Sequence, residues 1–355
     1  MISVQDLRQT HLEFMQSKGY SQINRTSLVS PIYPRMFTPS AGIPYIEDYL
    51  AGNEASNRVA CVQPCFRLDY IRVGDGRHLS LFEMGMTASC DGISHEEAIA
   101  DSYTFLKDRG LRPSQIIVTY FGGGQVNGEI FDEDIKSRNL LEKLGIPKYN
   151  LIKTDIKEGF EILPSQRYAG PRLEFFYIQG QSMIEIWTSL AYTHRVVTDE
   201  RHATKALTPL GHTAFAIGFG IERFCQALNA FPTIYEIDTI KPIAMIFYDS
   251  RKYATDPIII ADHLRGLALL VNDGVLEITG NSNRSRKSVI RRYLRNLSRH
   301  LEAMGLDKTA DSTWQKVRTA LEQVVEKHKS YYTELDGKAS MITTNIRKAL
   351  ACSSD

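Results

Sequence analysis

The 355-residue sequence lacks the features that would place it in a specialised class of protein. Its net charge is only +1, so no global field draws the molecule to nucleic acid or to a membrane. It has no apolar run of about eighteen residues, so no transmembrane helix is expected. It also has no internal repeat and no low-complexity segment. With 43% hydrophobic and 23% charged residues, the composition is that of an ordinary globular protein.

Cysteine is scarce as well. The five cysteines are odd in number and lie in apolar surroundings, which favours reduced thiols and a cytoplasmic location over a disulfide framework. The spacing of Cys61 and Cys65 is compatible with zinc, but no second pair of Cys or His follows at ligand spacing. The sequence therefore gives little support for a zinc site.

The first twenty residues predict an amphipathic helix and not a signal peptide. Asp6 and Glu13 stand among the apolar residues, which a signal peptide would not tolerate. Ser3 is suited to be the N-cap, with Asp6 three residues on, and Gly19 is suited to end the helix.

Short runs rich in β-forming residues dominate the chain up to about Pro242. Because they follow one another without regular helices between them, they favour an antiparallel sheet with helices around it, an α+β fold, over a doubly wound parallel sheet. In the run Ser182–Tyr192, the alternation predicts that Glu185, Trp187 and Ser189 share a face exposed to a cleft.

From about Pro257 the hydrophobic period becomes helical. Residues 258–274 place Ile260, Leu264 and Leu267 along one helical face, and three more helical segments follow. We therefore predict a domain at residues 1–247 and an all-helical domain at residues 257–355.

One of these helical segments is strongly basic. Between Asn283 and His300 there is no acidic residue, and Arg291, Arg295 and Arg299 recur four residues apart on one face. A solvated face would usually carry Glu or Asp partners, so a contact with the phosphate backbone of a nucleic acid is the favoured interpretation. The cations concerned are Arg284, Arg286, Lys287, Arg291, Arg292, Arg295 and Arg299.

The segment AIGFGIER, Ala216–Arg223, alternates small residues with large apolar ones and closes on Glu222 and Arg223, which we interpret as a buried ion pair. Taken alone, it is explained best by a buried strand that feeds a helix, with glycines where backbone packs on backbone. The alternative is that Gly218 and Gly220 let a nucleotide lie against the strand, with Arg223 reaching it.

A second segment supports the alternative. An apolar strand delivers Arg67, and a polar loop then turns back to His78 and Phe82, which point to one side if the return is extended. Arg67 and His78 offer positive charge to phosphates, and Phe82 offers a flat apolar face to a purine.

On these residues the sequence resembles the class II aminoacyl-tRNA synthetases. Arg67 followed by His78-x3-Phe82 resembles their motif 2, and Ala216–Arg223 resembles their motif 3. Within the class, the sequence is similar to the alanyl-tRNA synthetase family over nearly the whole chain. The blocks that match, in order, are Ser27–Pro31, Phe37–Gly42, Ala169–Tyr177, Ile184–Trp187 and Ile260–Leu276.

The resemblance implies a catalytic core that uses ATP and Mg²⁺ to activate an amino acid as its adenylate and then charges a tRNA. It implies that Arg67 holds the α-phosphate and the substrate carboxylate, and that Phe82 and Arg223 sandwich the adenine. His78 would contact the β- and γ-phosphates. Glu185 is the implied Mg²⁺ ligand, and the hydroxyl of Thr188 is suited to complete that site.

The sequence departs from the family in the amino-acid pocket. Ala216 stands where the family has the aspartate that holds the substrate ammonium, and Thr188 stands where it has a neighbouring asparagine. Glu161 aligns with a tryptophan. Alanine is therefore not the expected substrate, and Glu161 or Glu174 is a candidate to take over the ammonium. The predicted pocket comprises Glu161, Glu174, Trp187, Thr188, Ala216 and Gly218.

Two further departures concern the motif 2 loop and the length of the chain. The motif 2 loop is short and lacks the family's lysine, which Arg72 could replace. The chain lacks the editing domain and the dimerising C-terminal domain, so a monomer or weak dimer is expected. Asn283 matches the asparagine that reads the acceptor stem. The predicted tRNA-binding residues are Asn283, Arg286, Arg291, Arg292 and Arg295.

Two other functions stay open. The chain could pass the acyl group to a carrier protein or a small amine, or it could be a non-catalytic tRNA-binding paralogue. The retention of Arg67, Phe82, Glu185 and Arg223 speaks against the non-catalytic alternative, and the basic helix favours tRNA as the acceptor.

Overall fold

The computed structural model describes residues 1–29, 43–50, 57–67, 73–126, 128–163, 167–199, 204–249, 255–276 and 284–351. Its strands are β1 (Ser21–Gln22), β2 (Asn57–Phe66), β3 (Leu81–Cys90), β4 (Ile116–Phe121), β5 (Gly124–Val126), β6 (Glu129–Phe131), β7 (Leu151–Thr154), β8 (Phe160–Ile162), β9 (Tyr168–Gln179), β10 (Ser182–Thr198) and β11 (Thr204–Gly220). Its α-helices are α1 (Val4–Ser17), α2 (Ile43–Leu50), α3 (His95–Asp108), α4 (Ile135–Lys143), α5 (Ile156–Gly159), α6 (Ile221–Leu228), α7 (Lys241–Met245), α8 (Thr255–Asn272), α9 (Arg284–Ala303), α10 (Asp311–His328) and α11 (Ala339–Ala351). None of these helices has both the length and the apolar character that a membrane span requires.

A nine-stranded sheet forms the centre of the molecule. Its strand order is β1-β2-β3-β11-β10-β9-β4-β7, with β8 paired to β9. All neighbouring pairs are antiparallel except β1–β2 and β4–β7 at the two edges. The predicted α+β fold with a mainly antiparallel sheet is confirmed.

The N-terminal helix forms as its sequence predicts. The hydroxyl of Ser3 accepts from the Asp6 amide at 3.0 Å, and the Asp6 carboxylate accepts from the Ser3 amide at 2.9 Å. This reciprocal capping box satisfies amides that the first turn would otherwise leave unpaired. Helix α1 ends just before Gly19, whose φ of 81° suits glycine.

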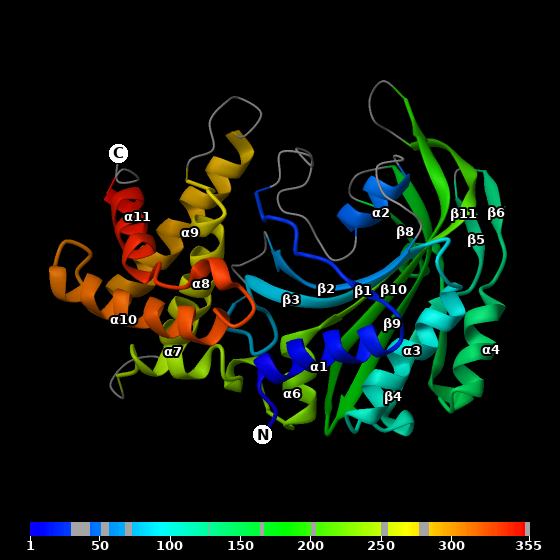
Figure 1. Cartoon of the computed structure of the whole chain (residues 1–355), viewed down its shortest axis with the longest axis horizontal. Helices are drawn as coiled ribbons and strands as arrows, with labels where there is room; N and C mark the ends of the chain where they lie inside the picture. Colours follow the sequence, from blue (N-terminus) through cyan, green and yellow to red (C-terminus); the bar gives the residue numbers. More distant parts are fainter. Residues whose placement is uncertain are drawn as a thin grey trace.

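The sheet is covered differently on its two faces. Figure 1 shows α1 and α6 on one side of the strands and α2 on the other. On β11, Phe215, Ile217 and Phe219 enter the core on the α1 side, whereas Ala216 belongs to the cluster beneath α2. The alternation in AIGFGIER thus buries its large residues on one face and leaves small residues on the other, where the cavity lies.

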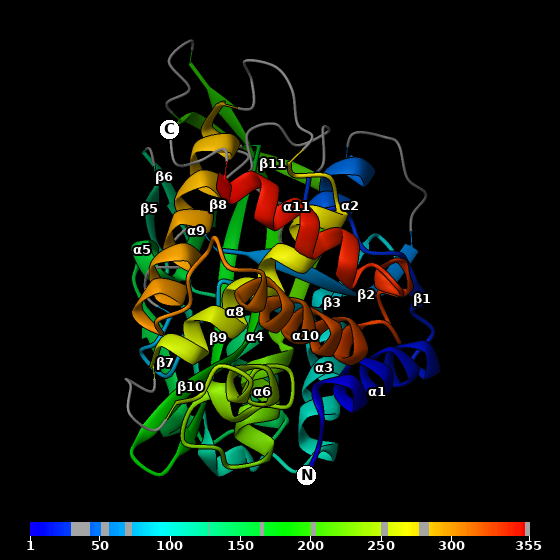
Figure 2. The same ribbon diagram turned by 90° about the vertical axis from the view of Figure 1, so that its left-hand side faces the viewer.

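The helices α7 to α11 gather at one end of the sheet, and α10 and α11 cross over α8 (Figures 1 and 2). Helix α8 packs against α7, α9, α10, α11 and β3. The predicted apolar residues Ile260, Leu264 and Leu267 are buried, as expected, but α8 is also buried on its other sides, including the polar Asp262, His263 and Arg265. The expected domain boundary near residue 250 falls partly outside the described residues and stays a prediction.

Candidate active site

A cavity of about 310 Å³ lies on the α2 side of the sheet. Its volume falls at the lower end of the range for small-molecule sites. The walls come from the β2–β3 hairpin, β8 to β11 and the start of α6. Every residue predicted for ATP, metal and amino acid lines it: Arg67, His78, Phe82, Glu161, Glu174, Glu185, Trp187, Thr188, Ala216, Gly218 and Arg223.

The β2–β3 hairpin supplies one wall. Arg67 follows the last residue of β2, and its amide donates to the carbonyl of Ser80 at 2.8 Å. The guanidinium carbon of Arg67 lies 5.0 Å from the centre of the Phe82 ring, within cation–π range. His78 is held by Asp75, whose carboxylate lies 2.5 Å from Nδ1 of the imidazole. Arg72 lies outside the described residues.

The β11–α6 junction supplies the facing wall. Gly218 pairs with Thr188 on β10, and Gly220 caps α6. A Cβ added at Gly220 would meet only the Arg223 side chain, at an ordinary contact distance of 3.7 Å. Packing therefore does not require this glycine. The absence of a side chain here keeps the cavity open beside Arg223.

Arg223 and the expected metal ligand contact each other. Nη1 of Arg223 donates to Oε2 of Glu185 at 2.7 Å and to the Glu185 carbonyl at 3.3 Å. Glu185 and Thr188 offer one carboxylate and one hydroxyl to the cavity, and no group of three His, Cys, Asp or Glu side chains gathers in the described residues. This donor set fits Mg²⁺ that takes most of its ligands from phosphates and water.

A β-bulge corrects the face predicted for β10. Against β9, the register shifts between Glu185 and Trp187, so Ile186 is the extra residue. As a result Glu185 faces the cavity together with Thr188, whereas Trp187 packs its ring 3.8 Å from that of Phe175. Ser189 contacts His95 of α3 on the opposite face, at 2.6 Å. The prediction that Glu185, Trp187 and Ser189 share one face is therefore wrong, although Trp187 still borders the cavity.

The model of one protein family, tRNA synthetases class II (A), matches residues 6–349. The chain belongs to this family. The alanine–tRNA ligase of Treponema denticola is 27% identical over 376 residues, which cover 97% of this chain and 59% of that protein. The alanine–tRNA ligase of Solibacter usitatus is 28% identical over 341 residues, covering 85% of this chain and 36% of that protein. The chain thus spans between about a third and three fifths of the length of these relatives.

Solved structures are more distant. An ATP phosphoribosyltransferase regulatory subunit/histidyl-tRNA synthetase from Bacillus halodurans aligns with a TM-score of 0.43 and 14% identity, covering 64% of this chain and 79% of that one. The aspartyl tRNA synthetase of Entamoeba histolytica aligns with a TM-score of 0.37 and 16% identity, covering 66% and 56%.

One corner of the cavity in this synthetase-family chain contains residues that sequence reasoning missed. Arg172 lies between the two carboxylates considered for the ammonium: Nη1 is 3.4 Å from Glu161 and Nη2 is 3.4 Å from Glu174. Tyr192 also lines the cavity. The period-two spacing of Arg172 and Glu174 on β9 was the available signal, because residues two apart in a strand share a face.

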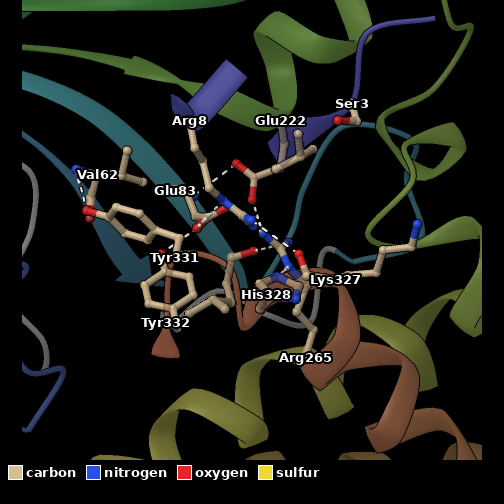
Figure 3. A network of polar contacts seen from close by, with 12 residues as sticks. Ser3, Arg8, Val62, Glu83, Glu222, Arg265, Lys327, His328, Tyr331 and Tyr332 are labelled. Carbon is tan, nitrogen blue, oxygen red and sulfur yellow. Dashed lines mark hydrogen bonds and ion pairs between the residues drawn. The ribbon is translucent and has the colours of Figure 1, made fainter. Parts of the chain in front are cut away.

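Glu222 does not pair with Arg223, contrary to the expectation from sequence. It pairs with Arg265 of α8 and accepts the amide of Glu83 at 2.9 Å. Figure 3 shows these groups as part of a buried network that also includes Arg8 of α1. His328 and Tyr332 complete it, the latter donating to Glu83. The network fixes the first turn of α6, and with it the backbone of Arg223.

The basic helix α9 exposes the predicted cations in part. Arg291, Arg292, Arg295 and Arg299 are exposed, and none forms an ion pair with a carboxylate of the described chain. Asn283 and the side chain of Arg286 lie outside the described residues. The helix thus presents exposed positive charge, and its contact with a tRNA stays a prediction.

Proposed function

We propose that this chain activates an amino acid with ATP as an aminoacyl-adenylate and transfers it to a tRNA. Residues 1–247 would carry the adenylation and residues 257–355 would bind the acceptor stem. The observation that carries the proposal is that Arg67 and Phe82 from the hairpin and Gly218 and Arg223 from the β11–α6 junction line one cavity.

The geometry suits attack of a carboxylate on the α-phosphorus of ATP. A substrate carboxylate oxygen forms the new bond to phosphorus, and pyrophosphate leaves with the electron pair of the broken bond. Arg67 stands where it can neutralise the negative charge that grows at the phosphorus, since Phe82 holds its guanidinium at the cavity wall. Removal of such a preorganised donor typically costs about 3 kcal/mol of transition-state stabilisation.

The purine would lie between Phe82 and Arg223, because an aromatic ring and a guanidinium both offer flat faces for stacking. His78 would reach the β- and γ-phosphates. Glu185 and Thr188 would hold Mg²⁺, which supplies positive charge to the phosphates when bound. Before ATP binds, the Arg223–Glu185 ion pair keeps both side chains at the cavity wall.

The tRNA acceptor is supported by α9, whose exposed arginines lack carboxylate partners in the described chain. The relatives named alanine–tRNA ligase support the same acceptor. Transfer to a carrier protein or a small amine would follow the same first step, so it is an alternative for the second step only.

The test is amino-acid-dependent exchange of pyrophosphate into ATP, with and without tRNA. We expect exchange only when an amino acid is present, and we expect Arg67→Ala to abolish it. Arg347→Ala is the matched control, because Arg347 is an exposed arginine on α11 that does not line the cavity. Undiminished exchange in Arg67→Ala, or equal loss in both variants, would sink the assignment.

A further inference from the structure

The carboxylates that line the cavity differ in how fully they are paired. Glu185 pairs with Arg223, and Glu222 belongs to a network in which two carboxylates, Glu222 and Glu83, meet two guanidinium groups, those of Arg265 and Arg8. Glu161 and Glu174 instead share Arg172, at 3.4 Å from each. Burial raises the pKa of Glu174, which Arg172 only partly opposes, as expected for a carboxylate with too little positive charge nearby. This corner therefore carries one more negative charge than positive.

A buried hydroxyl in the same corner lacks a partner. Tyr192 is 1% exposed and lines the cavity, and its Oη has no hydrogen-bond partner among the described residues. Burial, and next the charge of Glu161, raises the pKa of Tyr192 well above its usual value, so the phenol stays protonated. A buried polar atom without a partner is uncommon in native proteins, which points to a ligand that supplies one.

The strand order separates this corner from the part of the cavity where Arg67 and Phe82 would meet ATP. Arg67 and Phe82 lie on the β2–β3 side of β11, whereas Glu174 lies two strands away on its other side, on β9. Neighbouring strands are about 4.8 Å apart, so the backbone of Glu174 lies roughly 10 Å from that of β11. The residues of β11 that line the cavity are Ala216, Ile217, Gly218 and Gly220, and none of them has an acceptor on its side chain.

We propose that Glu174 and Glu161 bind the ammonium group of the substrate, and that this ammonium is separated from the activated carboxylate by two or more carbons. β-Amino acids, γ-amino acids and diamino acids have this chemistry. The inference rests on the proposed adenylation, because it takes the carboxylate to be activated beside Arg67. The apolar side chains of Leu163 and Leu190 line the same cavity and suit the methylenes of such a substrate.

The first experiment compares substrates of matched size in the exchange assay. β-Alanine and γ-aminobutyrate are compared with alanine and 2-aminobutyrate, and ornithine and lysine with norvaline and norleucine. We expect kcat/KM to be at least about tenfold higher for a displaced ammonium in one of these sets. A preference for the α-amino member in every set overturns the proposal.

The second experiment removes the negative charges one at a time. Glu174→Gln and Glu161→Gln keep the side-chain size, and loss of a charge-assisted bond should raise the KM for the amino acid about 10- to 100-fold. The KM for ATP and kcat should change little. Glu158→Gln is the control, because this exposed carboxylate lies near the corner but does not line the cavity. Unchanged KM values in both test variants, or an equal change in Glu158→Gln, contradict the proposal.

Calorimetric binding of the same amino acids, with a non-hydrolysable ATP analogue present, separates this inference from the proposed function. Tight binding of a displaced-ammonium substrate that is lost in Glu174→Gln supports the subsite even if no exchange occurs, in which case adenylation alone fails. If exchange occurs but prefers α-amino substrates, the result supports the proposed adenylation and contradicts the proposed ammonium subsite.

Discussion

Acidification from pH 7.5 to pH 5.0 should strongly destabilise the protein, because burial holds several histidines neutral in the fold, among them His11, His95 and His328. His328 shows the cause most clearly. Its Nδ1–H donates to the carbonyl of Val324 at 2.8 Å, and its Nε2 accepts from Nε of Arg265 at 3.2 Å. A proton on Nε2 would face that guanidinium donor. Burial, with Arg8 and Arg265, lowers the pKa of His328 to about 3.

The other two histidines lie beneath the sheet. Burial lowers the pKa of His11 and of His95 to about 4 each. His95 contacts Ser189, and Nε2 of His11 donates to the carbonyl of Met86 at 3.4 Å. No carboxylate of the described residues lies at hydrogen-bond distance from either ring to stabilise a charge.

The magnitude follows from linkage. Below pH 6.5, the pKa of histidine in the unfolded chain, the unfolded chain binds protons that the folded chain does not bind. The free energy of unfolding therefore falls as pH falls. At pH 5.0 each histidine contributes a loss of about 2 kcal/mol, or about 6 kcal/mol for the three. That is comparable with the whole stability of many domains, about 5–15 kcal/mol.

The shifted carboxylates Glu83 and Glu174 do not add to this loss of stability between pH 7.5 and pH 5.0. Burial alone would raise the pKa of Glu83, but the guanidinium groups of Arg8 and Arg265 hold it well below its usual value. Its contribution is therefore lost only as pH falls below about 4.5, the unfolded value. Glu174, whose pKa is raised, works in the opposite direction to the histidines.

Urea unfolding at constant ionic strength, in steps between pH 7.5 and pH 5.0, measures the effect. His328→Gln should reduce the pH-dependent loss by about 2 kcal/mol, whereas Arg318→Gln, at an exposed position of the same helix α10, should leave it unchanged. A total loss below about 1 kcal/mol, or the same pH dependence in all three proteins, would refute the reasoning.

Two further predictions concern the helical end of the molecule. Arg265→Met should lower the free energy of unfolding by about 3–5 kcal/mol, since it leaves the buried carboxylate of Glu222 without its partner. The control Arg318→Met, which breaks an ion pair on the surface, should lower it by less than about 1 kcal/mol. Neutralising Arg291 and Arg295 together should flatten the salt dependence of tRNA binding by up to about two units for every tRNA, whereas Asn283→Ala should reduce discrimination between acceptor stems in gel shifts and leave the slope nearly intact. Equal, negligible binding of all tRNAs by the unmodified protein would favour a different acceptor.

The sequence predicted what depends on local pattern. Strand alternation placed Ala216 and Gly218 on the open face of β11, and the capping box of Ser3 and Asp6 set the start of α1. The bulge at Ile186 was not predictable, because one extra residue changes no composition or spacing that marks it. It nevertheless reverses which of the following side chains face the cavity.

The buried ion network was beyond sequence reasoning for another reason. Arg8, Glu83, Glu222 and Arg265 are separated by up to 257 positions, and although the local segment predicted a buried Glu222, nothing local identifies Arg265 as its partner. The same holds for α8, where the sequence gives no sign that the polar Asp262, His263 and Arg265 are all buried. Such charges enter the interior only where partners from other elements meet them, and those partners appear only in the fold.

The helical end and the cavity are joined through a second buried contact. Ser80 in the β2–β3 hairpin donates its amide to Asp262 of α8 at 2.9 Å, and its hydroxyl lies 2.5 Å from both Asp262 and Tyr293 of the basic helix α9. The carbonyl of the same serine accepts the amide of Arg67. One residue thus connects the helix proposed to bind tRNA with the arginine proposed to bind the α-phosphate. Because Ser80, Asp262 and Tyr293 are buried and hydrogen-bonded to one another, a shift of α9 against the sheet would break several bonds at once. The two proposed functions therefore share one rigid frame, in which the acceptor stem would dock at a fixed position relative to the adenylate.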